Sequence, residues 1–304
     1  IGTEALGANT TGCLNVAIGR QTLYNNTTAN QNTAVGACAM YINTTGTQNA
    51  ALGYLSLFTN STGSHNSALG LRSLQNNTTG YANVAVGTCA LLSTTTGPNN
   101  VAVGFESLKA NTTGDSNNAI GRQALLSNTS GCYNEAHGYA ALEDNTTGCF
   151  NIGIGLGALR CNTTASNSTA VGACSLTANT TGADNTAVGY RALKANTTAC
   201  YNTAVGNYSL QANTTGANNT ATGFYALLSN TTGDLNTASG GYALCANTTG
   251  CRSTAVGYQA LLKATTGGFN TAVGTYAANQ MTVGKCNVVL GGEALFYNTS
   301  GCHN

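Results

Sequence analysis

The sequence predicts an all-β fold, a β-solenoid in which about 18 short coils of 17 residues stack on one another. Three observations lead to this prediction. They are an uninterrupted 17-residue repeat, short β-branched runs between glycine and asparagine, and the confinement of charge to a few places in the repeat. We number the repeat from Asn179 as position 1 to Ala195 as position 17.

The repeat runs through all 304 residues without an insertion or deletion. Position 11 is glycine in every copy, and position 2 is threonine in every copy except Ser61. Position 15 is leucine, and position 7 is asparagine, in 16 of 18 copies each. No linker interrupts the pattern, so we expect residues 1–304 to form one solenoid array. Because the chain starts at position 10 of the repeat, we also expect it to be a segment of a longer chain or fibre.

The residue types favour strands and turns over helices. Glycine recurs every seven or ten residues, and threonine, asparagine and β-branched residues dominate. Short β-branched runs bounded by asparagine and glycine, such as NTAVG at residues 185–189, indicate strands and turns. Of the 19 charged residues, 18 lie at positions 5, 6, 12, 13, 16 or 17, so these positions are expected to form solvent-facing bends.

Stacking places identical residues above one another, which explains the unusual composition. Asparagines at positions 1 and 7 are expected to form amide ladders from coil to coil. Side chains of the Val188 and Leu193 type are expected to supply a narrow apolar column. Positions 9 and 11, alanine and glycine, share one strand face. The sequence leaves two readings open: this face packs against another chain, or alanine fills a thin core while glycine makes the turn.

The charge balance argues against several function classes. Charged residues make up 6% of the chain and the net charge is +1, so no strong field attracts nucleic acid or an anionic membrane. The sequence contains no run of 18 apolar residues, so we expect no membrane insertion. His65, His137 and His303 are scattered and no CxxC pair occurs, so no metal or other cofactor is expected. No nucleophile–base–acid set stands out, and we expect no enzyme.

Asparagine at position 1 is followed by serine or threonine at position 3 in all 15 copies that have it, so each is a candidate N-glycosylation acceptor. Threonine also persists at Thr96 and Thr266, where the asparagine is absent, which favours a structural role such as a hydroxyl ladder. The alternative to glycosylation is an inward asparagine ladder. The candidate acceptors are Asn9, Asn26, Asn43, Asn60, Asn77, Asn111, Asn128, Asn145, Asn162, Asn179, Asn196, Asn213, Asn230, Asn247 and Asn298.

Twelve cysteines, an even number, indicate an oxidising compartment and disulfides. Cys132 and Cys149 occupy position 5 of adjacent coils, about 4.8 Å apart, within the Cα range that a disulfide accepts. Cys286 and Cys302 lie at positions 6 and 5 of adjacent coils and are also a candidate pair. Four cysteines recur every three coils and predict an exposed column that could cross-link neighbouring chains; the alternative is free surface thiols. The four are Cys149, Cys200, Cys251 and Cys302.

One coil departs from the pattern. Glu135 at position 8 is the only charged residue outside the variable positions, and His137 follows at position 10. Because they are two residues apart on one predicted strand, their side chains share a face. We expect a local carboxylate–imidazole pair; a metal bound with outside help is the other reading.

The phrases NTAVG and NTTG, arranged as ALxxNTTGxxNTAVGYxAL, resemble the repeats of tail-fibre or β-strand-repeat proteins of bacteria, phages and large viruses. NTAVG is also similar to the SVAIG-type strand of trimeric autotransporter adhesin heads. The resemblance implies an extracellular fibre, stalk or adhesin at a cell or virion surface, without catalysis.

We therefore expect a structural subunit that associates with itself, end to end or side by side, in a fibre or stalk. Neither end departs from the repeat as a cap would, which favours open filaments. The alternative is an adhesin or tail-fibre shaft that binds surface glycans through exposed tyrosine, asparagine and threonine. An ice-binding protein is less favoured, because adjacent threonines such as Thr180 and Thr181 point to opposite faces. The handedness and the number of chains per rod stay open.

Overall fold

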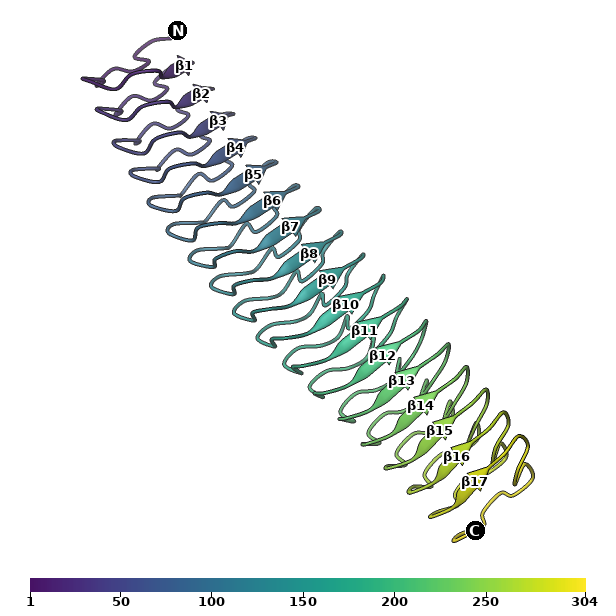
Figure 1. Ribbon diagram of the computed structural model, residues 1–304. Helices are drawn as coiled ribbons and strands as arrows, with labels where there is room; N and C mark the ends of the chain where they lie inside the picture. The colour runs from purple at the N-terminus through teal and green to yellow at the C-terminus, as the bar shows by residue number, and fades with distance from the viewer. The chain divides into compact units, whose positions relative to one another are not determined.

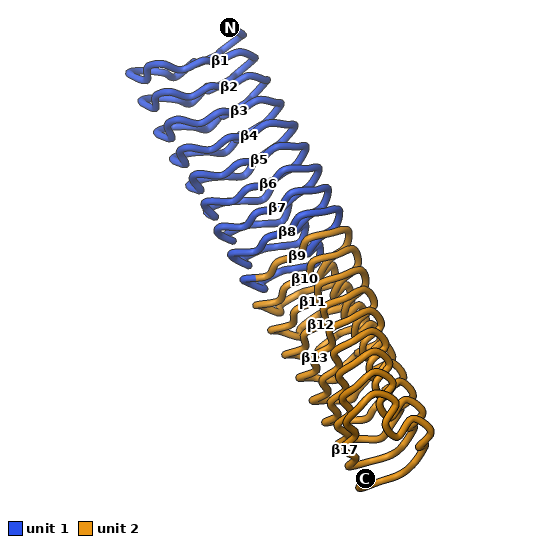
Figure 2. Tube along the Cα trace, turned by 45° about the vertical axis from the view of Figure 1, so that its right-hand side comes forward, with its two compact units in different colours: residues 1–150 blue, residues 151–304 orange.

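The computed structural model describes residues 1–304 and contains strands, turns and bends but no helix (Figure 1). It confirms the predicted β-solenoid, since each coil contributes one three-residue strand at repeat positions 8–10. The chain divides into two compact units, residues 1–150 and residues 151–304, each built from the same coil (Figure 2).

Within each unit, consecutive strands pair in parallel with no shift in register, so that Ala187 lies beside Ala204. Unit 1 contains β1 (Val16–Ile18), β2 (Thr33–Val35), β3 (Ala50–Leu52), β4 (Ser67–Leu69), β5 (Val84–Val86), β6 (Val101–Val103), β7 (Asn118–Ile120) and β8 (Glu135–His137). Unit 2 contains β9 (Ile152–Ile154), β10 (Thr169–Val171), β11 (Thr186–Val188), β12 (Thr203–Val205), β13 (Thr220–Thr222), β14 (Thr237–Ser239), β15 (Thr254–Val256), β16 (Thr271–Val273) and β17 (Val288–Leu290).

The coil turns through backbone with positive φ. Gly189 at position 11 has a φ of 131°, and a Cβ there would lie 2.7 Å from the carbonyl of Gly206 in the next coil. The invariant glycine is therefore required both for its dihedral angle and for close stacking. Asp184, Arg191 and Leu193, at positions 6, 13 and 15, have φ of 57°, 57° and 51°. Left-handed backbone costs about 1–2 kcal/mol per such residue, and the burial of Leu193 offsets part of this cost.

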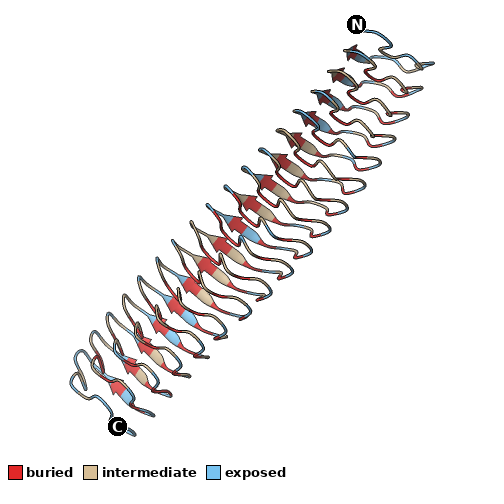
Figure 3. Ribbon diagram, turned by 180° about the vertical axis from the view of Figure 1, so that it is seen from behind, coloured by how far each residue is buried: buried red, intermediate tan, exposed pale blue.

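The core is narrow and lies on the inner face of the strands. Ala187 and Leu193 are fully buried, whereas Val188 is half-exposed (Figure 3). The predicted apolar column was therefore right for position 15 and wrong for position 10. Because side chains alternate along a strand, the alanine of position 9 points inward and its neighbours at positions 8 and 10 point outward. Of the two readings of the alanine and glycine face, the thin core with glycine at the turn is correct.

Asparagine at position 1 forms the predicted amide ladder inside the coil. Asn196 Nδ2 donates to Asn179 Oδ1 in the preceding coil (2.9 Å) and to the carbonyl oxygen of Ala199 in its own coil (3.0 Å). Asn213 Nδ2 donates in turn to Asn196 Oδ1 (3.0 Å). All three of these asparagines are fully buried, so their amides are satisfied by the chain and not by water.

Asparagine at position 7 forms a second ladder of a different kind. The backbone N–H of Asn202 donates to Asn185 Oδ1 (2.9 Å), and Asn202 Nδ2 donates to the carbonyl oxygen of Gly216 in the following coil (2.9 Å). That oxygen also accepts from Asn213 Nδ2 (2.8 Å), so the position-4 carbonyl joins the two ladders. Side-chain ladders of this kind stabilise sheets that stack over many strands.

The position-1 ladder breaks where the residue is not asparagine. Thr94 is fully buried and its Oγ1 has no hydrogen-bond partner, and the Oδ1 of Asn77 in the preceding coil has none either. Asn247 Oδ1 is left without a partner in the same way, below Ala264. These orphaned oxygens show that each amide depends on the amide of the next coil.

The two recurring threonines at positions 2 and 3 have different environments. Thr180 Oγ1, at position 2, donates to the carbonyl oxygen of Thr197 in the next coil (3.1 Å). Thr181, at position 3, is exposed. The hydroxyl ladder therefore lies at position 2, and its expected place at position 3 was wrong.

Candidate functional site

The fifteen candidate glycosylation acceptors lie mainly in the interior. Thirteen of them are fully buried, and only Asn9 and Asn298 are partly exposed. An N-linked sugar needs the side-chain nitrogen and open space around it. In the folded coil this nitrogen is engaged, as in Asn179, which donates to Asn162 Oδ1 (3.1 Å) and to the carbonyl oxygen of Gly182 (2.9 Å). Folded coils therefore do not support glycosylation at the buried asparagines, and the inward ladder is the reading that the structure favours.

Position 5 supplies an acceptor to the preceding coil. Cys149 Sγ accepts from the backbone N–H of Cys132 (3.1 Å), and Cys200 Sγ accepts from the N–H of Ala183 (3.3 Å). Oxygen takes the place of sulfur in other coils, as where Asp234 Oδ1 accepts from the N–H of Ala217 (2.6 Å). Sequence reasoning missed this role. The signal was the recurrence of cysteine, serine, asparagine and aspartate at one variable position.

The structure contains no disulfide bond among the twelve cysteines. The proposed pairs Cys132–Cys149 and Cys286–Cys302 do lie in adjacent coils, and both pairings stay predictions. Burial raises the pKa of the Cys132 thiol, and the backbone N–H of Asp115 opposes this shift. The inter-chain column of Cys149, Cys200, Cys251 and Cys302 is untested. Two of its members, Cys200 and Cys251, accept backbone N–H groups at 3.3 Å within the coil stack.

Glu135 and His137 form the local pair that the sequence predicted. Glu135 Oε2 lies 3.3 Å from His137 Nε2, on the outer face of β8. The Glu135 and His137 side chains are 47% and 37% exposed, whereas the His137 Nε2 atom is itself buried and makes no hydrogen bond. An exposed pair of this kind contributes about 0–1 kcal/mol. No third metal-ligating side chain joins them, since no cluster of three His, Cys, Asp or Glu exists in the chain.

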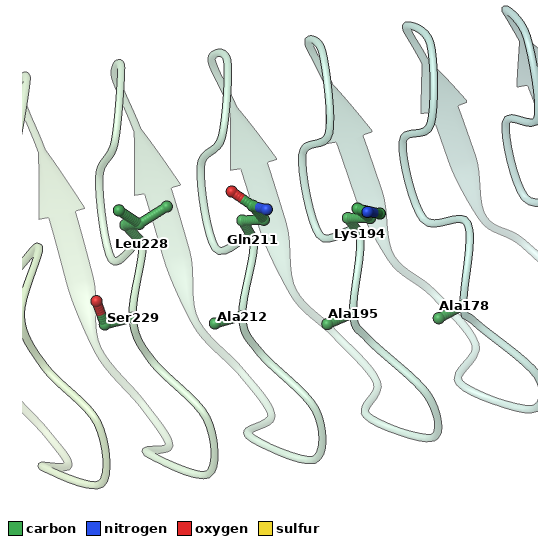
Figure 4. A pocket seen from close by; sticks show the side chains of 7 residues that line it. All are labelled: Ala178, Lys194, Ala195, Gln211, Ala212, Leu228 and Ser229. Carbon is green, nitrogen blue, oxygen red and sulfur yellow. The ribbon is translucent and has the colours of Figure 1, made fainter.

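One open hollow lies along positions 16 and 17 of unit 2 (Figure 4). Small side chains lie in one row, and longer ones lie in a second row beside them. Lys194 is its only charged group, so it offers no acid–base pair. The lining residues are Ala178, Lys194, Ala195, Gln211, Ala212, Leu228 and Ser229.

An aromatic run follows positions 12 and 13 of unit 2. Tyr208 and Tyr225 stack with ring centroids 5.1 Å apart, and Tyr225 and Tyr242 continue the run at 5.2 Å. Such spacings fall in the range of favourable aromatic pairs. Three residues of the run, Tyr190, Phe224 and Tyr258, are exposed. The run consists of Tyr190, Tyr208, Phe224, Tyr225, Tyr242, Tyr258 and Tyr276.

No family model matches this chain, and a search of curated proteins finds no match either. The structure has no helix of the length and apolarity that a membrane crossing requires.

Proposed function

We propose that the chain is a structural segment of an extracellular fibre or stalk, in which β-solenoids join end to end. The observation that carries this proposal is the polarity of the coil-to-coil bonds. The position-1 Nδ2 donates toward the preceding coil, and the position-1 Oδ1 accepts from the following one, as in Asn196. At position 2 the backbone bond has the opposite polarity, because Thr180 N–H donates to the carbonyl oxygen of Thr197 in the following coil, so each side of a coil offers both donors and acceptors.

Position 1 is asparagine in 15 of 18 copies, and the backbone groups recur in the coils, so most coils offer the same groups on their two sides. A coil of a second copy therefore meets the partners that the next coil of the same chain would supply. Such a head-to-tail contact does not close on itself and generates a linear filament. Low surface charge supports this arrangement, since the net charge of +1 opposes association only weakly.

Electron microscopy over a series of protein concentrations tests the proposal. We expect filaments of constant width whose lengths increase with concentration. Thr299→Pro should stop growth, because Thr282 N–H donates to the carbonyl oxygen of Thr299 (2.8 Å) and the N–H of Thr299 is the equivalent donor for a following coil. Thr299→Ala keeps that N–H and serves as the matched control. Discrete particles of single-chain mass at all concentrations would contradict the proposal.

A second candidate function is glycan binding by the aromatic run, as in an adhesin or tail-fibre shaft. Partly exposed rings in a row can stack on the apolar faces of successive sugar rings. The test is retention of the chain on immobilised glycans, with Tyr225→Ala and Tyr242→Ala as the loss variants. Tyr133→Ala in unit 1 is the control, because Tyr133 lies at repeat position 6, stacks on Phe150 (5.0 Å) and is not a member of the run. Equal retention of all variants would remove this candidate.

A further inference from the structure

The outer face of the sheet in unit 2 carries a regular array of threonines. Position 8 is threonine in seven consecutive strands, β10 to β16, and position 10 beside it is valine, threonine or serine. We call these two ranks the threonine array. Neither rank contains a charged residue. The position-8 members are Thr169, Thr186, Thr203, Thr220, Thr237, Thr254 and Thr271.

The centre of the array is the most polar and the most open part. In β13 and β14, Thr220, Thr222, Thr237 and Ser239 are all exposed. The structure gives none of the position-8 hydroxyls in β10–β16 a hydrogen-bond partner in the protein. At position 2, by contrast, the hydroxyl is committed to the next coil, as in Thr180. The array therefore presents hydroxyls whose donor and acceptor capacity is left to solvent.

The array is a two-dimensional lattice. Strands in parallel register repeat about every 4.8 Å, and side chains two residues apart on a strand repeat about every 6.6 Å. The register of β13 on β14 places Thr220 beside Thr237 and Thr222 beside Ser239. Threonine and valine are stiff about χ1, so methyl and hydroxyl groups keep fixed directions. The repeat of about 4.8 Å along the stack is close to one repeat of water molecules on a prism face of hexagonal ice, and the spacing of about 6.6 Å is shorter than the other repeat.

We propose that the threonine array binds ice. The hydroxyls anchor a first layer of water, the methyls between them order it, and the lattice of that layer continues into the crystal. Each contact is weak, but seven coils engage at once, so the contacts act together as in other multivalent binding. The proposal does not depend on the fibre function.

An ice surface fits this face better than a dry partner does. Packing the array against another protein surface would bury the hydroxyls, and each one left without a partner costs about 1–3 kcal/mol. Bound water instead supplies every hydroxyl with a partner. Thr181 and its equivalents at position 3 are also exposed, but they form a single rank at a bend and not a lattice on a sheet.

The same face of unit 1 provides the matched control. There position 8 holds several residue types, and Thr33 lies between Val16 and Ala50. Further along, Asn118 and Glu135 occupy it, and a carboxylate interrupts any regular water layer. We therefore assign ice binding to unit 2 alone.

The experiment measures how the purified chain partitions between a slowly growing ice body and the remaining liquid, and whether it shapes single ice crystals. The wild-type chain should enter the ice and facet the crystals. The double variant Thr220→Lys with Thr237→Lys should be excluded from the ice, because two long charged side chains break the lattice at its centre. Thr33→Lys, at the same repeat position in unit 1, should partition as the wild type does.

Exclusion of the wild-type chain from ice would overturn the proposal, and so would retained activity of the folded double lysine variant, which would point to the position-3 rank. Equal loss in Thr33→Lys would also overturn it. If the lysine variant loses its circular dichroism spectrum, Thr220→Val with Thr237→Val replaces it, since these changes keep the shape and remove the hydroxyls. We expect reduced partition into ice, and wild-type partition would overturn the proposal. A wild-type chain that binds insoluble polysaccharide but not ice overturns it as well.

Discussion

Thr94→Asn should stabilise unit 1 by repairing the broken amide ladder. Thr94 occupies position 1, is fully buried and has an unpaired Oγ1. Below it, Asn77 Oδ1 lacks a donor. Above it, Asn111 Nδ2 donates to the carbonyl oxygen of Gly114 (3.1 Å) and has no amide acceptor in the preceding coil. Asparagine at position 94 would donate through its Nδ2 to Asn77 Oδ1 and accept through its Oδ1 from Asn111 Nδ2.

The expected gain follows from the bonds of an intact stretch. Asn43 Nδ2 donates to Asn26 Oδ1 at 2.9 Å, and Asn60 Nδ2 donates to Asn43 Oδ1 at 2.8 Å. Two new bonds of this kind contribute about 1–3 kcal/mol in net terms. The side chain fits without strain, because thirteen other copies bury asparagine at the same position. For a unit of this size, each kcal/mol raises the melting temperature by about 2–4 °C.

Thermal melting followed by circular dichroism measures the gain, and hydrogen exchange of the neighbouring amides locates it. Thr94→Val is the matched control, because it removes a hydroxyl that has no partner and keeps the side-chain shape. We expect the control to melt close to the wild type. If Thr94→Asn folds but melts at or below the temperature of Thr94→Val, the amide ladder does not contribute as we have argued.

Three further outcomes follow from the same contacts. Gly189→Ala should lower stability by at least about 1–3 kcal/mol in chemical denaturation, because its φ of 131° is strained for alanine and the Cβ meets the carbonyl of Gly206; wild-type stability would contradict this. Chain secreted from a glycosylating host should carry no sugar on its thirteen buried sequon asparagines, and peptide mass mapping that finds sugar there would show that those coils are not folded in this way. The hydrogen bond from Lys109 (2.7 Å) lowers the pKa of Glu106, against the opposing effect of burial, so its stabilising contribution is present above the ordinary pKa of 4.5 and is lost as pH falls through the lowered pKa. Glu106→Gln should therefore lower the free energy of unfolding by a few tenths of a kcal/mol near pH 7 and leave it equal to that of the wild type in strong acid. A difference that persists in acid would exclude this bond as its cause.

The repeat alone was sufficient to predict the fold. Strict spacing forces equal residues above one another, so the ladders of Asn179 and Asn185 follow from register with no knowledge of the coil's path. One of the two readings of position 11 had glycine make the turn, and Gly189 both makes the turn and allows the close approach of the next coil.

The path of the coil could not be predicted in the same way. Leu193 adopts a left-handed backbone that leucine rarely takes. The local sequence therefore does not predict the bend at Leu193. Without that bend, the inward face of the strand is ambiguous, and Val188 was assigned to the core although it points outward. The threonine array was overlooked for the same reason, because position 10 of its strands was assigned to the inner apolar column.

X-ray diffraction from an aligned specimen of the assembled chain tests the central claim most directly. If solenoids join end to end through their amide and backbone ladders, coils stack along the fibre axis. A strong reflection at about 4.8 Å should then lie on the meridian. The same reflection on the equator would mean that the coils stack across the fibre, and it would contradict end-to-end assembly.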